Sequence, residues 1–273
     1  MSSCRADDID PIVAIITDHD EDDGEASAQS FAASDLSNLF VLEWRGKAAG
    51  ISGCVPIPGS DGAYWLSWTY LDKALRGQGH GRRLVDRALD EMRYRNARKV
   101  FIKVSDYRDD ESGDLYAAAR KCYASAGFRE ELFIRDYYDK GESLTIFSLE
   151  PTPTRSKPAL TIEEEYPALE IERWFEIAET DNAWSLAWRV KRGRSSLGAA
   201  LARTGESAFT APNLERDLAR IAADGARAAF LSFPSTLASV REPLAAAGFE
   251  AIGRLIDFHG AGLHEQHFGR YFD

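Results

Sequence analysis

Apolar residues recur along the first half of the chain with two different periods. Helical stripes, in which every third or fourth residue is apolar, are expected from Ile9 to Ile16, from Gly81 to Met92 and from Leu115 to Ala126. Alternating or continuous apolar runs between Gly and Pro turns predict strands at 39–44, 48–56, 63–71 and 100–104, and a closing hairpin over 128–138 and 143–149. Strands mixed with amphipathic helices predict an α/β fold.

Residues 151–158 interrupt this pattern with three prolines in eight positions. Proline lacks a backbone N–H and fixes φ, so such a segment extends neither a strand nor a helix and favours an extended spacer. We therefore expect a domain over residues 1–150, a linker over 151–158 and a second, smaller domain over 159–273.

The second half contains an echo of the first at a constant offset of 121 residues. The segments that correspond are Ala126–Glu130 with Ala247–Ala251, Asp136 with Asp257, and Gly141 with Gly262. One reading is an internal repeat of a supersecondary unit, which the shared spacing favours. The other is that a Gly-Phe pair after a helix recurs by chance.

Composition and charge disfavour several classes of function. The net charge of −11 disfavours broad nucleic-acid binding, which needs a basic face. No apolar run is long enough to span a bilayer, and the first residues carry no apolar signal-peptide region. Cys4, Cys54 and Cys122 are odd in number and far apart. They predict neither a disulfide framework nor a metal cluster, and fit a reducing cytoplasm.

A glycine-rich segment, Leu75–Leu84, carries the clearest chemical signal. It reads LRGQGHGRRL and joins a predicted strand to a predicted helix. Alternating glycines leave the backbone uncovered and permit positive φ, so that their N–H groups can converge on an anion. The start of the following helix offers further free N–H groups and a positive dipole end. A diphosphate is the expected occupant.

Arg82 and Arg83 point the same way, because cations in the first helical turn are disfavoured unless an anion lies beside them. The alternative is a solvated arginine pair at a turn. The segment lacks the G-x-x-x-x-G-K-[ST] pattern of a P-loop, and Arg82 breaks the G-x-G-x-x-G pattern of dinucleotide folds.

Over residues 3–150 the sequence resembles the GNAT superfamily of acyl-CoA-dependent N-acetyltransferases. Residues 76–81, RGQGHG, satisfy that family's [Q/R]-x-x-G-x-[G/A] signature. Tyr123 precedes the Gly127-Phe128 pair by four residues on the next helix, with Ala119 one turn earlier, as the family pattern requires. The order and spacing of the predicted elements agree as well.

The resemblance implies a GNAT fold, with a mixed, mostly antiparallel sheet flanked by helices, and acetyl-CoA as co-substrate without a metal. The strand Tyr64–Leu71 would splay from its neighbour, and the Leu71 N–H would polarise the thioester carbonyl. A primary amine would attack directly, and Tyr123 would protonate the departing thiolate. The residues expected to bind the co-substrate are Tyr70, Leu71, Arg76, Gly77, Gln78, Gly79, His80, Gly81, Arg82 and Tyr116.

Three departures from the family pattern qualify this expectation. Tyr116 stands where the family often has an Asn that contacts the CoA arm, and Lys73 stands where it often has Pro. No carboxylate on the central strand stands out as the general base, so deprotonation goes through water or through a carboxylate that the sequence does not locate. Tyr123 also has a second reading, as a core aromatic on an apolar helical face.

Residues 18–25, DHDEDDGE, hold six carboxylates. In the family this segment lines the acceptor entrance, so an acidic lip would attract a cationic small-molecule amine. The preferred reading is nevertheless a solvated acidic loop. His19 is expected at the surface, with a catalytic base or a metal ligand as the alternatives. An oligomer is compatible with the sequence.

The second domain lacks the chemistry of the first. After the predicted strand Trp184–Val190, residues 191–198 lack the alternating glycines, and Leu244 replaces Tyr123 in the repeat. The resemblance implies a degenerate GNAT-like copy, with a vestigial anion site at Arg192 and Arg194 as the alternative. The whole chain is thus expected to be an N-acetyltransferase. The alternatives are a non-catalytic acyl-CoA-binding sensor or scaffold and, less favoured, a nucleotide-binding interaction module.

Overall fold

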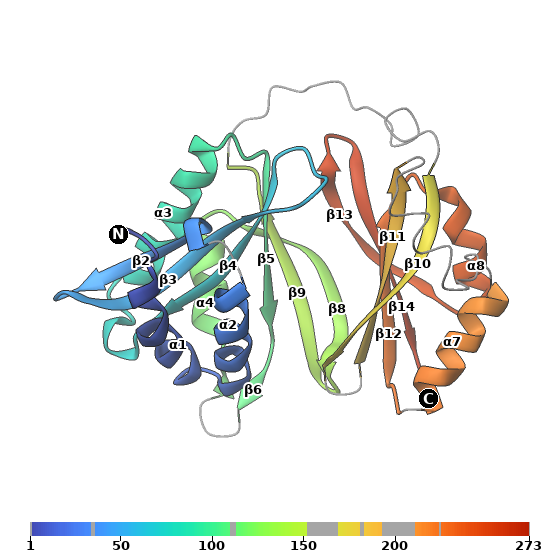
Figure 1. Ribbon diagram of the computed structural model, residues 1–273, viewed down its shortest axis with the longest axis horizontal. Coiled ribbons are helices and arrows are strands. Elements are labelled where there is room, and N and C mark those ends of the chain that lie inside the picture. The colour runs from blue at the N-terminus through green and yellow to red at the C-terminus, as the bar shows by residue number, and fades with distance from the viewer. Residues whose placement is uncertain are drawn as a thin grey trace. The chain divides into compact units, whose positions relative to one another are not determined.

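The computed structural model describes residues 2–33, 36–109, 113–151, 169–180, 183–192, 211–223 and 225–272 (Figure 1). The chain divides into two compact units. The first comprises residues 1–104, 116–129 and 147–155, and the second comprises 105–115, 130–146 and 156–273. Residues 152–158 of the predicted linker lie outside the described residues.

The elements up to residue 149 are, in chain order, β1 (Ser2–Ser3), α1 (Ile9–Thr17), α2 (Glu21–Ala33), β2 (Leu39–Trp44), β3 (Lys47–Pro56), β4 (Ala63–Leu71), α3 (His80–Tyr94), β5 (Lys99–Ser105), β6 (Arg108–Asp109), β7 (Gly113–Asp114), α4 (Ala117–Ser125), β8 (Arg129–Asp139) and β9 (Glu142–Leu149). The later elements are β10 (Leu169–Thr180), β11 (Ala183–Arg192), α7 (Ala211–Ala223), β12 (Ala228–Pro234), α8 (Arg241–Ala246), β13 (Glu250–Gly260) and β14 (Leu263–Tyr271). Short 3-10 turns lie at Ala6–Asp8, Leu36–Asn38, Lys73–Leu75 and Ala238–Val240.

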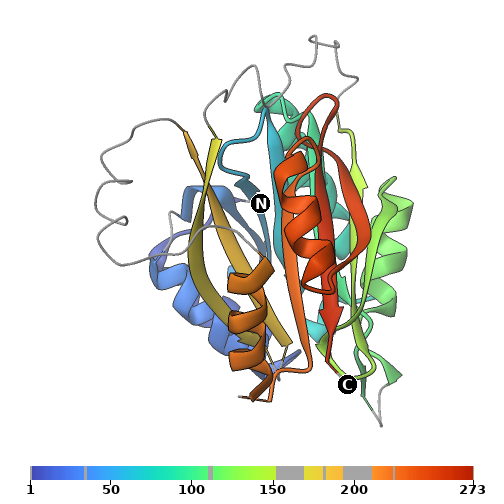
Figure 2. The same cartoon turned by 90° about the vertical axis from the view of Figure 1, so that its right-hand side faces the viewer.

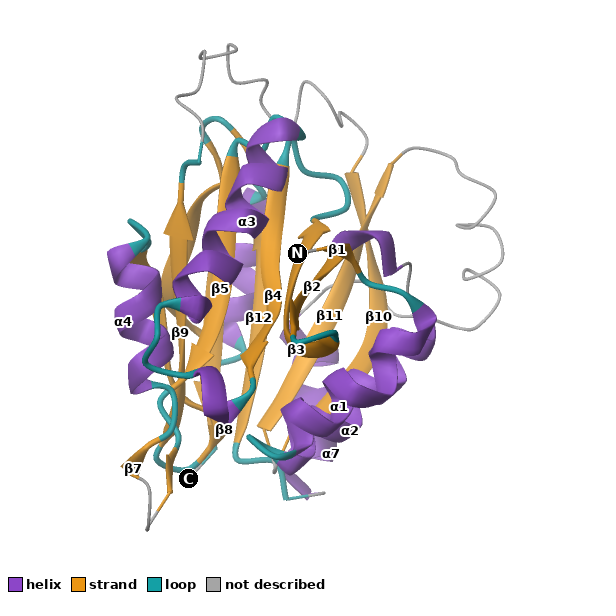
Figure 3. Ribbon diagram, turned by 90° about the vertical axis from the view of Figure 1, so that its left-hand side faces the viewer, coloured by secondary structure: helices purple, strands orange, loops and turns teal. Residues whose placement is uncertain are grey.

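The first unit is built on strands in the order β1-β2-β3-β4-β5. Neighbours from β1 to β4 are antiparallel, whereas β4 and β5 are parallel. The helices α1 and α2 lie on one side of these strands and α3 on the other (Figure 3). The predicted mixed, mostly antiparallel sheet flanked by helices is thereby confirmed.

Buried apolar stripes hold the helices to the sheet. Leu84, Val85, Ala88, Leu89 and Met92 of α3 are all almost fully buried, as their spacing predicts. The last four pack with Leu66 of β4 and with Tyr123 of α4 in one cluster, whereas Leu84 packs in another. On the other side, Ile12 and Ile16 of α1 pack with Phe31 of α2. These two layers place β4 between two helical coverings.

Residues 21–25 of the acidic run are helical, so the expectation of a loop there was wrong, whereas Glu21, Asp22 and Glu25 are exposed to solvent as expected. Asp20 receives a hydrogen bond from the Asp23 N–H at 3.0 Å, which caps the start of α2. Glu21, Asp22 and Asp23 occupy the first turn, where negative side chains favourably oppose the helix dipole. The sequence hid this helix because its residues are mainly polar and small and form no pronounced apolar stripe.

The second unit holds a sheet in the order β10-β11-β12-β14-β13. The pair β11 and β12 is parallel, and the other neighbours are antiparallel. The helices α7 and α8 lie side by side against this sheet (Figure 2). Their apolar residues pack with Leu231, Phe233 and Phe268 of the strands. The predicted strand Trp184–Val190 lies within β11.

The 121-residue offset recurs in the backbone conformation. Gly127 and Gly248 both have positive φ (97° and 75°), and Asp136 and Asp257 share the left-handed region (50° and 55°). Each of these aspartates accepts a hydrogen bond at 2.8 Å from the N–H of the glycine five residues on. The same hairpin conformation, with the same aspartate–glycine hydrogen bond, thus occurs twice and supports the internal repeat.

Candidate functional site

The strand β4 parts from β5 after the first third of its length. Its pairing with β5 covers only Ala63, Tyr64 and Trp65, whereas β4 itself continues to Leu71. Between the pairs Ile51–Tyr70 and Gly53–Ser67, β4 has one residue more than β3. This bulge contains Trp68, whose φ is 48°. The predicted splay of Tyr64–Leu71 is therefore present, and a bulge lies beside it.

The backbone of Leu71 points into the splay. In an antiparallel pair, hydrogen-bonded and non-hydrogen-bonded positions alternate. Because the Asp72 N–H donates to the Ala49 carbonyl at 2.9 Å, the neighbouring pair Leu71–Gly50 is non-hydrogen-bonded. The N–H and C=O groups of Leu71 therefore point away from β3. The carbonyl accepts a hydrogen bond from Arg76 Nε at 3.0 Å.

The glycine loop turns an open backbone surface outward. Gly77 and Gly79 have φ of 72° and 82°, which side chains with a Cβ rarely adopt. A Cβ built on Gly77, Gly79 or Gly81 would meet no atom within 4 Å. In the described part of the chain, no backbone N–H from Gly77 to Arg82 makes a hydrogen bond. These donors lie at the start of α3, where the helix dipole adds positive potential.

Two side chains of this loop have contacts within the protein. Gln78 Nε2 donates to the Ala74 carbonyl at 2.8 Å, which closes the turn before the helix. His80 is buried, with its ring 5.2 Å from that of Trp44. Any contact of Gln78 or His80 with a ligand would therefore come from the backbone.

Arg82 has partners of its own. Its Nε donates to Asp86 at 2.8 Å and its Nη1 to the Ser125 carbonyl at 2.7 Å. The Arg82 guanidinium thus has partners in a carboxylate and in the carboxyl end of α4, so its position in the first helical turn does not require a bound anion. The argument that an arginine in the first turn requires a ligand does not hold at this position.

Tyr123 of α4 packs against β4. It is 5% exposed and packs edge-on against Phe128, at 6.0 Å between ring centroids. Its side chain is hydrogen-bonded to Thr69, and the Thr69 hydroxyl lies 3.0 Å from that of Ser52. Burial raises the pKa of Tyr123 well above its usual range, and the Thr69 hydrogen bond opposes that rise. The phenol is therefore protonated at neutral pH.

The predicted co-substrate residues Tyr70 and Tyr116 turn their side chains to a carboxylate. Both hydroxyls donate to Asp23, the Tyr116 contact being 3.2 Å, and Tyr116 also donates to Asp20 at 3.2 Å. The ring of His19 lies edge-on to both tyrosines, at 5.5 and 5.6 Å. His19 is therefore not an isolated surface residue, and its expected exposure was wrong.

Burial is the largest cause of the pKa shifts of Asp23, Tyr70, Tyr116 and His19. It raises the pKa of Asp23, and the charge of Asp20 raises it further, against the two tyrosine hydrogen bonds. Burial also raises the pKa of Tyr70 and Tyr116 and lowers that of His19, which Arg76 lowers further. The two phenols and the imidazole are thus neutral at pH 7.

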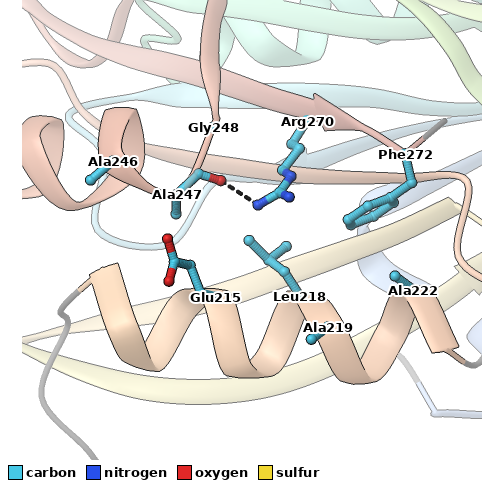
Figure 4. Close-up of a pocket in the computed structure, with 9 residues that line it drawn as sticks. All are labelled: Glu215, Leu218, Ala219, Ala222, Ala246, Ala247, Gly248, Arg270 and Phe272. Carbon is cyan, nitrogen blue, oxygen red and sulfur yellow. Dashed lines mark hydrogen bonds between the residues drawn. The ribbon is translucent and has the colours of Figure 1, made fainter.

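A separate cavity lies in the second unit, between α7 and α8 (Figure 4). Glu215 and Arg270 stand on its two sides, and Arg270 donates a hydrogen bond to the Ala247 carbonyl. Small residues form much of the wall. The lining residues are Glu215, Leu218, Ala219, Ala222, Ala246, Ala247, Gly248, Arg270 and Phe272. Leu244, at the position that corresponds to Tyr123, is fully buried and has no group that could protonate a leaving group.

Thr69 and Leu71 lie on the same stretch of β4, and Tyr123 of α4 contacts Thr69. The glycine loop follows a few residues further along the chain. Sequence reasoning missed Ser52, Thr69 and Asp23. Ser52 and Thr69 carry no motif, and Asp23 is one of six carboxylates whose spacing does not distinguish it. The side chain of Arg192 and residues 193–198, which carry the suggested vestigial anion site, lie outside the described residues.

In the part of the chain that the structure describes, no group of three or more His, Cys, Asp or Glu side chains is placed so that it could hold a metal ion. Likewise, none of the described helices has the length and apolarity that a membrane span requires.

Comparison with known proteins relates part of the chain, a little under half of it, to one family. Residues 10–128 match the model of the acetyltransferase (GNAT) family. This match supports an acyltransferase as the class of enzyme. No protein of curated function matches the sequence.

Solved structures resemble a little over half of the chain. The ribosomal-protein-S18-alanine N-acetyltransferase from Escherichia coli is 23% identical, with 58% of this chain and 97% of that chain covered and a TM-score of 0.44. The aminoglycoside 6′-N-acetyltransferase from Enterococcus faecium is 14% identical, with 57% and 98% covered and a TM-score of 0.47. The ribosomal-protein-alanine N-acetyltransferase from Brucella melitensis is 20% identical, with 54% and 97% covered and a TM-score of 0.45.

Proposed function

We propose that residues 10–128, which match the model of the acetyltransferase (GNAT) family, form an acetyltransferase domain, and that the protein transfers an acetyl group from acetyl-CoA to a primary amine by direct attack. The single observation that carries the proposal is the set of free N–H groups from Gly77 to Arg82 at the start of α3. It sits beside a strand that has separated from its neighbour.

The glycine loop is the binding site proposed for the CoA diphosphate. Its free N–H groups and the helix dipole supply the positive potential, and the open space around Gly77, Gly79 and Gly81 admits phosphate oxygens close to the backbone. No cationic side chain is required for this contact, which agrees with the engagement of Arg82 by Asp86 and Ser125.

The N–H of Leu71 is the donor proposed for the thioester oxygen. When the amine attacks, negative charge develops on that oxygen, and a fixed donor stabilises the charge without reorganising. Arg76 holds the Leu71 carbonyl at 3.0 Å, which fixes the peptide that follows it. Removal of one such donor in other enzymes costs about 3 kcal/mol in the barrier.

Tyr123 is the group proposed to protonate the CoA thiolate. If Ser52 donates to Thr69 and Thr69 donates to Tyr123, the phenol keeps its own proton for the sulfur. The carbon–sulfur bond breaks as the carbon–nitrogen bond persists, and the thiol leaves neutral. Its raised pKa keeps Tyr123 protonated for this step over the whole neutral range.

The proposal extends to the second domain and to the setting of the enzyme. Residues 159–273 are proposed as a degenerate GNAT-like copy, which the repeated hairpins at Asp136 and Asp257 support. It lacks the tyrosine acid and is proposed not to catalyse. A cytoplasmic setting is supported by Cys4, Cys54 and Cys122, all of which are free thiols.

Titration calorimetry with acetyl-CoA and a thiol-release assay test the proposal. The purified chain should bind acetyl-CoA and release CoA in the presence of at least one amine among n-butylamine, spermidine, L-lysine and kanamycin. Absence of acetyl-CoA binding contradicts the loop assignment. Binding without release with any amine contradicts catalysis and favours the sensor alternative.

A further inference from the structure

Small side chains leave a cavity between α7 and α8 of the second unit (Figure 4). Ala219 and Ala222 line it from α7, and Ala246 and Ala247 line it from the end of α8 and the residue that follows. The cavity has a volume of about 340 Å³, at the lower end of the range for small-molecule sites. Its size therefore suits a compact ligand rather than a nucleotide.

The repeat offers a comparison with the first unit at the same helix end. At the offset of 121 residues Ser125 corresponds to Ala246, and the Ser125 carbonyl accepts a hydrogen bond from Arg82 of α3 at 2.7 Å. In the second unit the arginine at this helix end comes from a strand instead: Arg270 of β14 donates to the Ala247 carbonyl. The facing residues of α7 include alanines, so the space beside the Arg270 guanidinium stays open.

Two opposite charges face this cavity without pairing. Figure 4 shows the carboxylate of Glu215 on α7 and the guanidinium of Arg270 on opposite sides of the cavity. Among the described residues, Glu215 has no side-chain hydrogen bond or ion pair, and the Arg270 guanidinium has only the Ala247 carbonyl and the Phe272 ring, at 5.4 Å from its centroid. A guanidinium has several N–H donors, so donors of Arg270 remain for an anion.

The rest of the wall is apolar. Leu218 is almost fully buried, and it packs with Phe272 in the core cluster of the second unit. Both residues also line the cavity. A ligand that matches the whole wall carries a positive group for Glu215, a negative group for Arg270 and an apolar part for Leu218 and Phe272. An α-amino acid with an aliphatic side chain has these three parts on a single carbon atom.

We propose that the cavity between α7 and α8 binds a free aliphatic α-amino acid as its zwitterion. The ligand carboxylate accepts hydrogen bonds from Arg270, the ammonium donates to Glu215, and the side chain covers Leu218. Hydrogen bonds at both ends are charge-assisted and therefore stronger than neutral ones. A residue at a peptide terminus carries only one of the two charges, which selects the free amino acid. The inference does not depend on acetyl transfer, because every residue that it uses lies in the second unit.

Titration calorimetry of the purified full chain tests the proposal with L-leucine and L-valine. Each amino acid is compared with the amine that lacks its carboxylate and with the carboxylic acid that lacks its ammonium group. We expect at least one amino acid to bind with a Kd below about 1 mM. Its two analogues should bind about tenfold more weakly or not at all, because each leaves Arg270 or Glu215 without a partner.

Two variants at exposed positions change the cavity without touching the core. Glu215→Gln removes one charge and should weaken binding about tenfold, as expected for the loss of a charge-assisted hydrogen bond. Ala219→Leu fills the space and should abolish binding. The matched controls are Glu242→Gln on α8 and Ala223→Leu on α7, both exposed and outside the cavity lining. The controls should bind within about threefold of wild type, or about 0.65 kcal/mol.

Arg270→Gln should weaken binding as much as Glu215→Gln, with Arg254→Gln, an exposed arginine of β13, as its control. Because Arg270 also holds the Ala247 carbonyl, its Tm is measured alongside, and Glu215→Gln and Ala219→Leu decide the test if this variant unfolds.

Three results overturn the inference. The first is that neither amino acid binds the wild type at the expected strength. The second is that the amine or the acid binds as tightly as the amino acid. The third is that Glu215→Gln and Ala219→Leu bind no more weakly than their controls, which would place the amino acid at another site. Acetyl-CoA binding and thiol release test the proposed function separately.

Discussion

The hydroxyl of Tyr123 on α4 is hydrogen-bonded to Thr69 on β4, and Thr69 in turn lies 3.0 Å from Ser52 on β3. Three elements thus contribute to one chain of hydroxyls that ends at the proposed acid. Ser52 is fully buried and Tyr123 nearly so, which gives the phenol a fixed orientation.

Tyr123→Phe should lower kcat for thiol release by about 100-fold, since a positioned general acid contributes 10²- to 10⁴-fold. The Kd for acetyl-CoA, measured by calorimetry, should change by less than threefold. Tyr94→Phe is the matched control, because Tyr94 lies 84% exposed at the end of α3. An equal rate in Tyr123→Phe and the wild type would assign Tyr123 to the core only.

Thr69→Val should raise the pKa of Tyr123 further, because it removes the hydrogen bond that opposes the effect of burial. A weaker acid protonates the thiolate more slowly, so kcat should fall by about tenfold while acetyl-CoA binding remains. Thr69→Ser keeps the hydroxyl and should restore most of the rate. If Thr69→Ser is as slow as Thr69→Val, then packing of the methyl group, and not the hydroxyl, is what matters.

Gly79→Val should abolish acetyl-CoA binding. The branched side chain would occupy the open space above the loop and would also strain a φ of 82°. Gly46→Val is the control: Gly46 has φ of 76° and equally open surroundings, but lies in the β2–β3 turn. Calorimetry should show loss of binding in the first variant alone. Affinity retained within about threefold, or about 0.65 kcal/mol, would refute the loop assignment.

Asp23→Asn should stabilise the fold at neutral pH. The pKa of Asp23 is raised above its usual 3.8, so the native state binds the proton more tightly than the unfolded chain. Ionisation therefore costs stability as the pH rises above that usual value, and the amide avoids this cost. The Tm of Asp23→Asn should equal that of wild type near pH 4 and exceed it near pH 7. A constant deficit at both pH values would show that the carboxylate stabilises the fold.

Gly53→Ala should destabilise the β3–β4 pair next to the bulge. A Cβ there would stand 2.7 Å from Ser67 Oγ and 2.8 Å from Leu39 Cδ2, so neighbouring groups must move. Overpacking of this kind costs about 1–3 kcal/mol, measurable by urea unfolding. Gly81→Ala is the control, since its Cβ would meet nothing within 4 Å and a helical alanine is favoured over glycine. Equal stability of both variants would contradict the tight contact.

The local signals in the sequence were sufficient for much of the fold. The stripe from Leu84 to Met92 predicted α3 and its buried face, and the turn residues predicted the hairpins, because both depend on neighbours within a few positions. The acidic residues after α1 were misread for the same reason. The start of α2 depends on the capping bond to Asp20 and on the helix dipole, and α2 carries no strong apolar period.

The sequence alone was enough to locate the glycine loop and the tyrosine that precedes Gly127. Each is a contiguous pattern, and its chemistry follows from backbone freedom and helix polarity. The tertiary structure alone decided the partners of these groups. Thr69 meets Tyr123, and Asp23 meets Tyr70 and Tyr116, only because β4 is covered by helices on both faces, and strand alternation sends neighbouring side chains to opposite layers. Contacts across 47 to 93 residues leave no local pattern, and burial then sets the pKa values on which the chemistry depends.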